Sequence, residues 1–421
     1  ESLEEKSKTI MLYIVGSDLE SDAALATAEL LEMEDANVDL SAYRIVVYMG
    51  GANNYYNDYV KTGENAILSL TENGFTVEDA FSSKNMGSSD TLSYFINYVT
   101  DHYTSDEYSL ILWDHGGGPL IGYGQDETTN DILTLNEISS ALSNTNFNRD
   151  NKLGFIGFDA CLMASIEVAY LLNDYAHYLI ASQETEPGFG WDYTFLSNLS
   201  ANSTNEEIGK SIIDTYFEYS TTNNYTYDIT LSMLDLNKVS QVEKELNQYF
   251  ANVKEVLSNS TFTSFARKRI VTKTFGGFNS STSYDLVDLY NMIDVIELNS
   301  SEYLKEAIKS LVVYNRSNVD NANGVSIYYP YSNKIYASSF INIYNSFDFA
   351  TNYTSYINQF ADILLGDRLK NLDISNSMPM VSSDDNYDFV LELTDDEANN
   401  YVEASYIVFR KTEDGFYESL Y

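Results

Sequence analysis

The chain has 421 residues, of which 44% are hydrophobic, so it can bury a sizeable core and lacks the composition of a disordered protein. Its formal net charge of −40, from 63 acidic and 23 basic residues, disfavours nucleic acid as a partner and favours cationic peptides, although a role in solubility alone would also explain this charge. No apolar run approaches the ~20 residues of a membrane span, and the single cysteine excludes an internal disulfide.

The first half of the chain alternates between strand and helix patterns. Short apolar runs bounded by glycine or polar residues indicate buried strands, and apolar residues at helical spacing indicate helices. Strands are expected at residues 9–15, 43–49, 66–70, 76–81 and 178–182, with one helix at 19–33 and another capped by Ser88. This alternation predicts an α/β fold with a mostly parallel sheet sandwiched by helices.

Two further apolar strands end in residues that can carry chemistry. The run at residues 110–113 leads to His115 and to three glycines, Gly116–Gly118. The run at residues 155–158 leads to Cys161, the only cysteine. Ligands bind outside the carboxyl ends of parallel strands, so His115 and Cys161 are expected to meet at that edge of the sheet.

A single cysteine with a histidine elsewhere in the chain is a candidate nucleophile and base. Apolar spacing after Cys161 predicts a helix start there, where free N–H groups and the helix dipole favour a thiolate. A buried core thiol is the alternative. A metal hydrolase is not expected, because the histidines are scattered and H-E-x-x-H is absent, and a lipase-like hydrolase is not expected because G-x-S-x-G is absent.

The order of these motifs resembles the clostripain family of cysteine peptidases, which belongs to the caspase-like clan. HGGG at 115–118 follows one strand, and DACLMA at 159–164 follows the next. Similar pieces are IMLYIVGSDLES at 10–21, NMGSSDTL at 85–92, SQETEPGFGWDY at 182–193 and NGVSIYYP at 323–330. The resemblance implies a caspase-like peptidase domain, placed at 1–335, and leaves 336–421 as a helix with a small, mainly β extension.

The resemblance also implies roles for individual residues. Cys161 would attack the scissile carbonyl, His115 would protonate the leaving amine, and the N–H groups of Gly116 and Cys161 would form the oxyanion hole. No third catalytic residue, metal ligand or cofactor is required, and Asp114 is expected to point away from His115. The expected substrate-binding residues are Asp159, Gln183, Glu184 and Trp191, although Trp191 is equally interpretable as a packing aromatic.

Asp159 resembles the family residue that lines the pocket for the residue before the cut, so cleavage after arginine or lysine is predicted. Capping of the following helix is a compatible second role for Asp159. Family members often carry a further acidic residue in the P-G-x-G loop, where this chain has Phe189, so a shifted preference is the alternative. The nearest acidic residues are Glu184, Glu186 and Asp192. The competing function class is a non-catalytic binding protein on a peptidase scaffold.

The segment between His115 and Cys161 leaves two questions. Activating cleavage in similar peptidases often falls here at a basic residue, so either Arg149 is cut or the protein stays one chain, which is favoured. Residues 126–137 have oxygen-bearing side chains at the spacing of a calcium-binding loop. Asp131, however, occupies the position at which such a loop needs glycine for its turn. A capping box of Thr134 and Glu137 is the favoured interpretation, with calcium as a weak alternative.

The second half is expected to be largely helical. Helices are predicted within 204–258, at 284–296 and near 353–364, strands at 229–234 and 325–329, and a β pattern at 387–421. Thr204 and Glu207 form a second capping box, and Asn237 is expected to cap a long helix. The basic cluster at 267–269 is interpreted as a solvated turn. A monomeric, secreted or cell-surface bacterial protein is expected, with any signal segment removed ahead of the opening ESLEEKSK.

Overall fold

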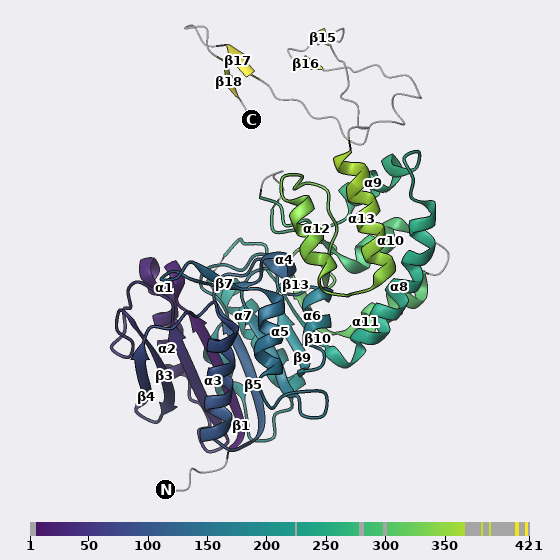
Figure 1. Cartoon of the computed structure of the whole chain (residues 1–421). Helices are drawn as coiled ribbons and strands as arrows, with labels where there is room; N and C mark the ends of the chain where they lie inside the picture. Colours follow the sequence, from purple (N-terminus) through teal and green to yellow (C-terminus); the bar gives the residue numbers. More distant parts are fainter. Residues whose placement is uncertain are drawn as a thin grey trace.

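The computed structural model of the chain describes residues 6–223, 225–277, 282–297 and 301–366, together with four short strands closer to the C-terminus. Two parts make up the described body, a large sheet with its flanking helices and a second, mainly helical part (Figure 1). The following paragraphs concern these residues.

A nine-stranded sheet forms the centre of the first part, in the order β13-β10-β9-β8-β5-β1-β2-β3-β4. The five middle strands are parallel, and two antiparallel strands extend the sheet at each edge. The strands are β1 Lys6–Val15, β2 Tyr43–Gly50, β3 Glu64–Thr71, β4 Gly74–Ser82, β5 Ser105–Trp113, β8 Leu153–Asp159, β9 Ala176–Ala181, β10 Thr230–Asp235 and β13 Val312–Ser317. The predicted mostly parallel sheet is therefore confirmed, whereas β13 has no counterpart among the predicted strands.

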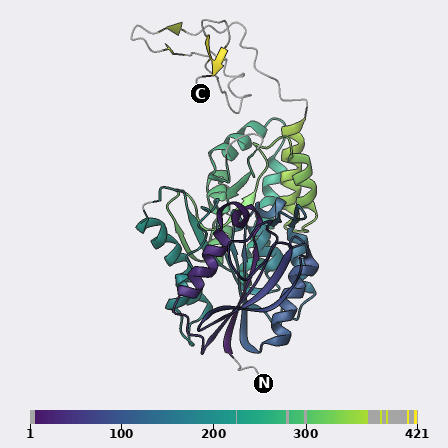
Figure 2. The ribbon, with the colours of Figure 1, turned by 90° about the vertical axis from the view of Figure 1, so that its left-hand side faces the viewer.

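Helices cover both faces of this sheet (Figure 2). Alternate residues of each middle strand point to opposite faces, so Met11 and Tyr13 join one core while Ile10 and Leu12 join the other. Helices α3 Ser89–His102, α5 Leu135–Ser143 and α6 Ile166–Leu172 pack on the first face. Helices α2 Leu25–Asp35 and α7 Asn205–Thr222, with the 3₁₀ turn η1 Tyr193–Asn198, pack on the second.

The second part combines helices with a small antiparallel sheet in the order β11-β12-β14. Its elements are α8 Val239–Val256, α9 Phe262–Val271, β11 Thr274–Phe275, β12 Leu286–Asp288, α10 Leu289–Ile296, α11 Ser301–Leu311, β14 Ser326–Tyr328, α12 Ala337–Asn345 and α13 Thr351–Leu365. Helix α13 packs on α8, so residues beyond 335 share a core with the rest. The domain division after residue 335 stays a prediction.

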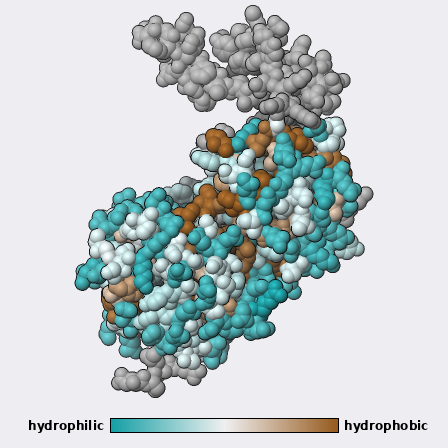
Figure 3. Space-filling view, in the orientation of Figure 1, coloured by the Kyte–Doolittle hydropathy of each residue, from teal (hydrophilic) through white to brown (hydrophobic). Residues whose placement is uncertain are grey.

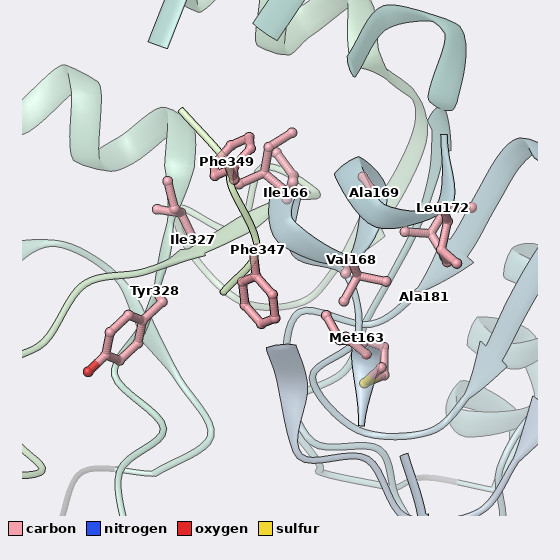
Figure 4. Packing of buried hydrophobic residues seen from close by; sticks show 14 of the residues in the cluster. Met163, Ile166, Val168, Ala169, Leu172, Ala181, Ile327, Tyr328, Phe347 and Phe349 are labelled. Carbon is pink, nitrogen blue, oxygen red and sulfur yellow. The ribbon is translucent and has the colours of Figure 1, made fainter. Parts of the chain in front are cut away.

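The two parts meet through apolar side chains. Figure 4 shows Ile166 and Val168 of α6 near Phe347, Phe349 and Ile327 of the second part. On the face in Figure 3, hydrophobic residues gather over α12 and the short helix α4 Gly118–Ile121, in a surface that is otherwise largely hydrophilic. Because this core is continuous, the second part supports the loops that follow β5 and β8.

Four local predictions differ from the structure. The helix expected at 19–33 is two helices, α1 Ser17–Ala23 and α2, because Ala24 adopts a left-handed φ of 57°. The helix expected at 284–296 begins at Leu289, after strand β12. The long helix α8 begins at Val239 after the 3₁₀ turn η2 Leu236–Lys238, which Asp235 caps in place of Asn237. The basic cluster lies in helix α9, not in a solvated turn.

The C-terminal β prediction falls mostly outside the described residues. Within it, β15 Met380–Val381 pairs with β16 Tyr387–Asp388, and β17 Phe409–Lys411 pairs with β18 Tyr417–Ser419, both antiparallel. The predicted helix near 353–364 is confirmed as α13. The capping box of Thr204 and Glu207 is confirmed at the start of α7.

Arg269 is buried with only 2% of its side chain exposed, and it forms an ion pair with buried Asp285 at 3.1 Å. Its guanidinium also donates to the Tyr329 carbonyl and to the Thr274 hydroxyl. We expect Arg269→Ala to lower the free energy of unfolding by about 3–5 kcal/mol, because it leaves a buried carboxylate without its counter-ion. Urea unfolding followed by circular dichroism would measure this change.

Arg149→Ala is the matched control for Arg269→Ala. Arg149 pairs with Asp174 at the surface, with 78% of the Arg149 side chain exposed. Removing an exposed pair should leave the unfolding midpoint almost unchanged. Equal midpoints for the two variants would contradict the role assigned to Arg269.

Candidate active site

The candidate site lies at the carboxyl ends of the parallel strands β1, β5 and β8. Strands β5 and β8 are neighbours, and the Asp114 amide just beyond β5 donates to the carbonyl of Asp159 at 3.3 Å. A cavity of about 200 Å³ opens there. Its lining residues are Leu19, Trp113, Asp114, His115, Asp159, Ala160, Cys161, Glu186, Pro187, Gly188 and Gly190. The structure thus brings together His115, Cys161 and Asp159, as the sequence predicts.

Cys161 lies in a turn and not at the start of a helix. Leu162 adopts a left-handed φ of 67°, and helix α6 begins only at Ile166, with Ser165 as its N-cap. The predicted activation by a helix dipole is therefore wrong, because the dipole acts within the first turn of a helix. Burial raises the pKa of the Cys161 thiol above its ordinary value of 9.0, and hydrogen bonds from the backbone of Glu186, Gly116 and Cys161 itself oppose this rise.

Gly116 approaches the backbone of Cys161 too closely for any side chain. A Cβ at this position would lie 2.0 Å from the Cys161 carbonyl oxygen and 2.9 Å from its nitrogen. Backbone groups of Gly116 and Cys161 both form hydrogen bonds with the Cys161 sulfur, and the Glu186 amide donates to that sulfur at 3.2 Å. The backbones of residues 116 and 161 therefore lie close together beside the sulfur.

His115 is half-exposed and contacts a carboxylate that the sequence reasoning did not single out. Its Nε2 lies 2.8 Å from Oδ1 of Asp18, which follows strand β1 in helix α1. Partial desolvation raises the pKa of Asp18, but the hydrogen bond and the charge of His115 outweigh it and lower this pKa overall. The only hint in the sequence was the position of Asp18 just after a parallel strand.

Asp114 precedes His115 but binds elsewhere, as expected. Its carboxylate accepts from the Ser17 hydroxyl and from the Gln125 amide, both at 2.6 Å. Burial raises the pKa of Asp114 to about 7. Asp114 therefore joins the loops around the site and does not orient the His115 ring directly.

Besides Asp114, two further residues with carboxyl groups line the cavity, Asp159 and Glu186. Asp159 accepts from the Trp191 amide and the Tyr193 hydroxyl, both at 3.1 Å, and it also bonds to the Glu186 side chain. Burial raises the pKa of Asp159 to about 7, and burial together with the nearby Asp159 charge raises the pKa of Glu186. One carboxyl oxygen of Glu186 is buried and has no hydrogen-bond partner.

A third carboxyl group lies behind Asp159. Glu29 of helix α2 is 3% exposed, and one of its oxygens is buried without a partner. A Cβ at Gly190 would lie 3.1 Å from the other Glu29 oxygen and 3.0 Å from Asp159, so these groups converge behind the cavity wall. Burial and the Asp159 charge raise the pKa of Glu29. Several acidic groups therefore lie at or behind the cavity wall, and no arginine or lysine is among the lining residues.

Phe189 does not occupy the cavity. Its ring stacks on Tyr225 at 4.7 Å between centroids and also contacts Tyr216 and Tyr219. The acidic residue of the 183–193 loop that does line the cavity is Glu186, one of the three nearby acids in the sequence. Because Phe189 faces a tyrosine cluster, its presence in the loop does not remove negative charge from the cavity.

The other predicted substrate-binding residues lie outside this cavity. Gln183 is fully buried and binds Asp288 and the Gly324 amide. Glu184 accepts from the Gly276 amide and lines a separate cavity of about 440 Å³ beside the first. Trp191 is 1% exposed in the core and donates to Glu186 at 3.4 Å, so its packing interpretation describes it better.

The loop with a calcium-like spacing is held by other contacts. Thr134 and Glu137 form the predicted capping box of helix α5, so Glu137 is engaged there. Asp126 accepts from the Met86 amide and from Thr128. Among the described residues, no group of three or more His, Cys, Asp or Glu side chains is arranged to hold a metal ion. No helix in the described part of the chain could cross a membrane.

Comparison with known proteins decides the family. A profile described as the clostripain family matches residues 12–368, most of the chain. The chain belongs to the clostripain family. It is 26% identical to clostripain of Hathewaya histolytica over 317 residues, which cover 60% of this chain and 59% of that protein. The chain thus matches less than two thirds of the length of that relative.

Two solved structures share the fold of this clostripain-family chain. One is a secreted C11 cysteine protease from Bacteroides thetaiotaomicron in complex with an irreversible peptide inhibitor, with 22% identity, a TM-score of 0.61, and coverage of 82% of this chain and 99% of that one. The other is an inactive zymogen C11 protease from Parabacteroides distasonis, with 19% identity, a TM-score of 0.65, and coverage of 82% and 98%. The caspase-like fold predicted from the motifs is therefore confirmed.

Alkylation of Cys161 should be slow at neutral pH and should keep rising above pH 9.0, because burial raises the pKa of the thiol in the free protein. Only the thiolate reacts, so the rate follows the ionised fraction. Iodoacetamide labelling followed by mass spectrometry measures this rate directly, since Cys161 is the only cysteine. Cys161→Ser is the blank, and a rate that levels off below about pH 8 would contradict the predicted shift.

Proposed function

We propose that this clostripain-family protein is a cysteine endopeptidase that cleaves peptide bonds after arginine or lysine, with His115 and Cys161 as its catalytic dyad. The supporting observation is the cavity between these residues, which Asp159 and Glu186 line and behind which Glu29 lies. Burial raises the pKa of all three carboxyl groups, and the charge of Asp159 raises those of Glu186 and Glu29 further, so an arriving cation would stabilise them. A guanidinium or ammonium group on the substrate supplies that cation.

In the proposed reaction, the Cys161 sulfur attacks the scissile carbonyl carbon as the thiol proton passes to His115. The carbonyl oxygen gains negative charge, and the N–H groups of Gly116 and Cys161 donate to it. When the carbon–nitrogen bond breaks, His115 returns the proton to the leaving amine. Water then attacks the thioester, His115 takes a proton from the water, and the released thiol recovers a proton from His115.

The close approach of the Gly116 and Cys161 backbones supports these roles. Gly116 has room only for hydrogen beside Cys161, and backbone groups of both residues lie beside the sulfur that would attack the carbonyl. The raised pKa of the thiol means that His115 must accept the proton during attack, because little thiolate exists beforehand. In the sequence prediction, a helix dipole and His115 together activated the thiol. Here His115 alone does so.

Secretion from a bacterial cell is part of the proposal. It is supported by the fold shared with the B. thetaiotaomicron protease, which is described as secreted. Function as a monomer and independence from calcium stay predictions. Arg149, the candidate activation site, is exposed at the surface between His115 and Cys161, so a protease can reach it.

A panel of fluorogenic peptides with Arg, Lys, Asp, Asn or Leu before the bond tests the activity. Turnover is expected for Arg and Lys, and Cys161→Ala should abolish it. Asp159→Asn should lower kcat/KM for Arg peptides by about 100-fold, because it removes a desolvated partner of the cation. The exposed Asp150→Asn gives the same change in net charge and should have no effect.

Absence of turnover from folded protein would leave an uncleaved zymogen or a binding scaffold. Mild trypsin treatment before the same panel separates them, since only a zymogen gains activity. Turnover of Leu or Asn peptides alone would keep the dyad and contradict the proposed specificity.

The preference for arginine should grow with pH. Because the pKa of Asp159 is raised to about 7, the carboxyl group is protonated and neutral below that pH and attracts cations fully only above it. The ratio of kcat/KM for an Arg peptide to that for the neutral citrulline analogue should therefore rise between about pH 6 and pH 8. In Asp159→Asn this rise should shrink, and a ratio independent of pH in the wild type would contradict the titration of Asp159.

A further inference from the structure

We propose that Asp18 is a positioning residue for His115, fixing the ring through Nε2 and stabilising the protonated imidazole that forms during the reaction. The inference rests on the proposed function, because it gives His115 a proton to hold. It assigns a task to a carboxylate that neither the sequence motifs nor a simple dyad requires.

Two adjacent contacts clamp the beginning of helix α1 to the end of β5. Ser17 donates to Asp114 at 2.6 Å, and the next residue, Asp18, meets the next residue, His115, at 2.8 Å. Ser17 adopts a left-handed φ of 49°, which turns the chain sharply after β1. Asp114 is buried and directly precedes His115. The hydrogen bond from Ser17 to Asp114 therefore holds Asp18 close to the His115 ring.

The remainder of α1 is anchored as well, so Asp18 is held on a rigid support. Buried Glu20 accepts from the Thr27 amide at 2.8 Å and from the Thr27 hydroxyl at 2.6 Å, which joins α1 to α2. Ser21 donates to Glu127 at 2.6 Å, which joins α1 to the loop after β6 (Tyr123–Asp126). A carboxylate on such a support loses little side-chain entropy when it binds the ring.

The chemistry of the pair determines which ring nitrogen serves the substrate. An ionised carboxylate only accepts hydrogen bonds, so Nε2 of His115 carries the hydrogen of this contact. The other ring nitrogen, Nδ1, is then left to exchange a proton with the thiol and the leaving amine. The lowered pKa of Asp18 keeps its carboxylate charged at neutral pH.

The other titratable groups at the cavity have different partners. Asp114, Asp159 and Glu186 line the cavity with His115, but their side chains bind Ser17, Gln125, the His115 backbone, Trp191, Tyr193 and one another. Cys161 is bound by backbone amides, and Glu127 is bound by Ser21 and the Asn53 amide. Among the described residues, Asp18 is thus the carboxylate that forms an ion pair with the His115 ring.

Exposure limits the size of the effect. The side chains of His115 and Asp18 are 44% and 58% exposed, so solvent and salt screen their attraction. A loss of about tenfold in kcat is therefore expected on removal of the Asp18 charge, rather than the larger loss typical of buried pairs. The same screening predicts that high salt narrows the difference between wild type and variant.

Asp18→Asn compared with Asp22→Asn tests this inference. Asp22 lies in the same helix, is exposed, and gives the same change in net charge away from His115. The chain has only three histidines, so NMR of the ring nitrogens can follow each, with His115→Ala identifying the resonances of interest. The nitrogen shifts should place the ring hydrogen of His115 on Nε2 in the wild type and in Asp22→Asn, and should show less of this tautomer in Asp18→Asn.

Peptide cleavage gives the second readout. We expect kcat on an Arg peptide to fall about tenfold in Asp18→Asn with KM nearly constant, because the pair acts on the proton and not on the basic side chain. Asp18→Glu should restore part of the loss. Identical ring-nitrogen spectra of His115 in the two asparagine variants would overturn the inference, and the NMR result is obtained even if no peptide is cleaved, so it is distinguishable from failure of the proposed function.

Discussion

The close approach of two strand ends is the constraint on which the site depends. Strands β5 and β8 are parallel neighbours, and the turns that follow them touch at Gly116 and Cys161. A side chain at position 116 would displace the backbone of Cys161, so the glycine is a steric requirement and not only a source of flexibility. The sulfur, the amides around it and the cavity beside it all take their positions from this contact.

The second part of the molecule forms hydrogen bonds with the segment that follows the Cys161 turn. The Ser326 amide at the start of β14 donates to the Ala164 carbonyl at 2.8 Å, and the Tyr328 amide donates to Glu167 at 2.9 Å. Since β14 is itself packed on α12 and α13, the turn rests on the shared core rather than on its own strand alone. A turn that contains a left-handed Leu162 needs such support, because that conformation is unfavourable for leucine.

The sequence allowed the parallel sheet, the two strand ends and three residues of the cavity to be predicted, because apolar runs and the motifs after them are local signals. Residues Asp18 and Glu186 were beyond reach as functional assignments, since their roles arise from contacts between distant segments. The start of α6 was misplaced because apolar spacing continues through the turn, although the Ser165 cap marks the real boundary. Phe189 seemed to weaken the acidic cavity only because a sequence does not show which way a loop residue points.

The acidic cavity also bears on the stability of the protein that contains it. Glu29, Glu186 and Asp159 are like-charged or protonated groups taken out of water, and two of their oxygens have no hydrogen-bond partner. Such groups lower the stability of the free fold, as strained functional sites commonly do. Under the proposed function, a basic peptide that neutralises them would bind the native state alone and would raise its stability by mass action. A basic substrate of the proposed peptidase would therefore also stabilise its fold. The unfolding temperature of the protein should be highest when substrate is bound.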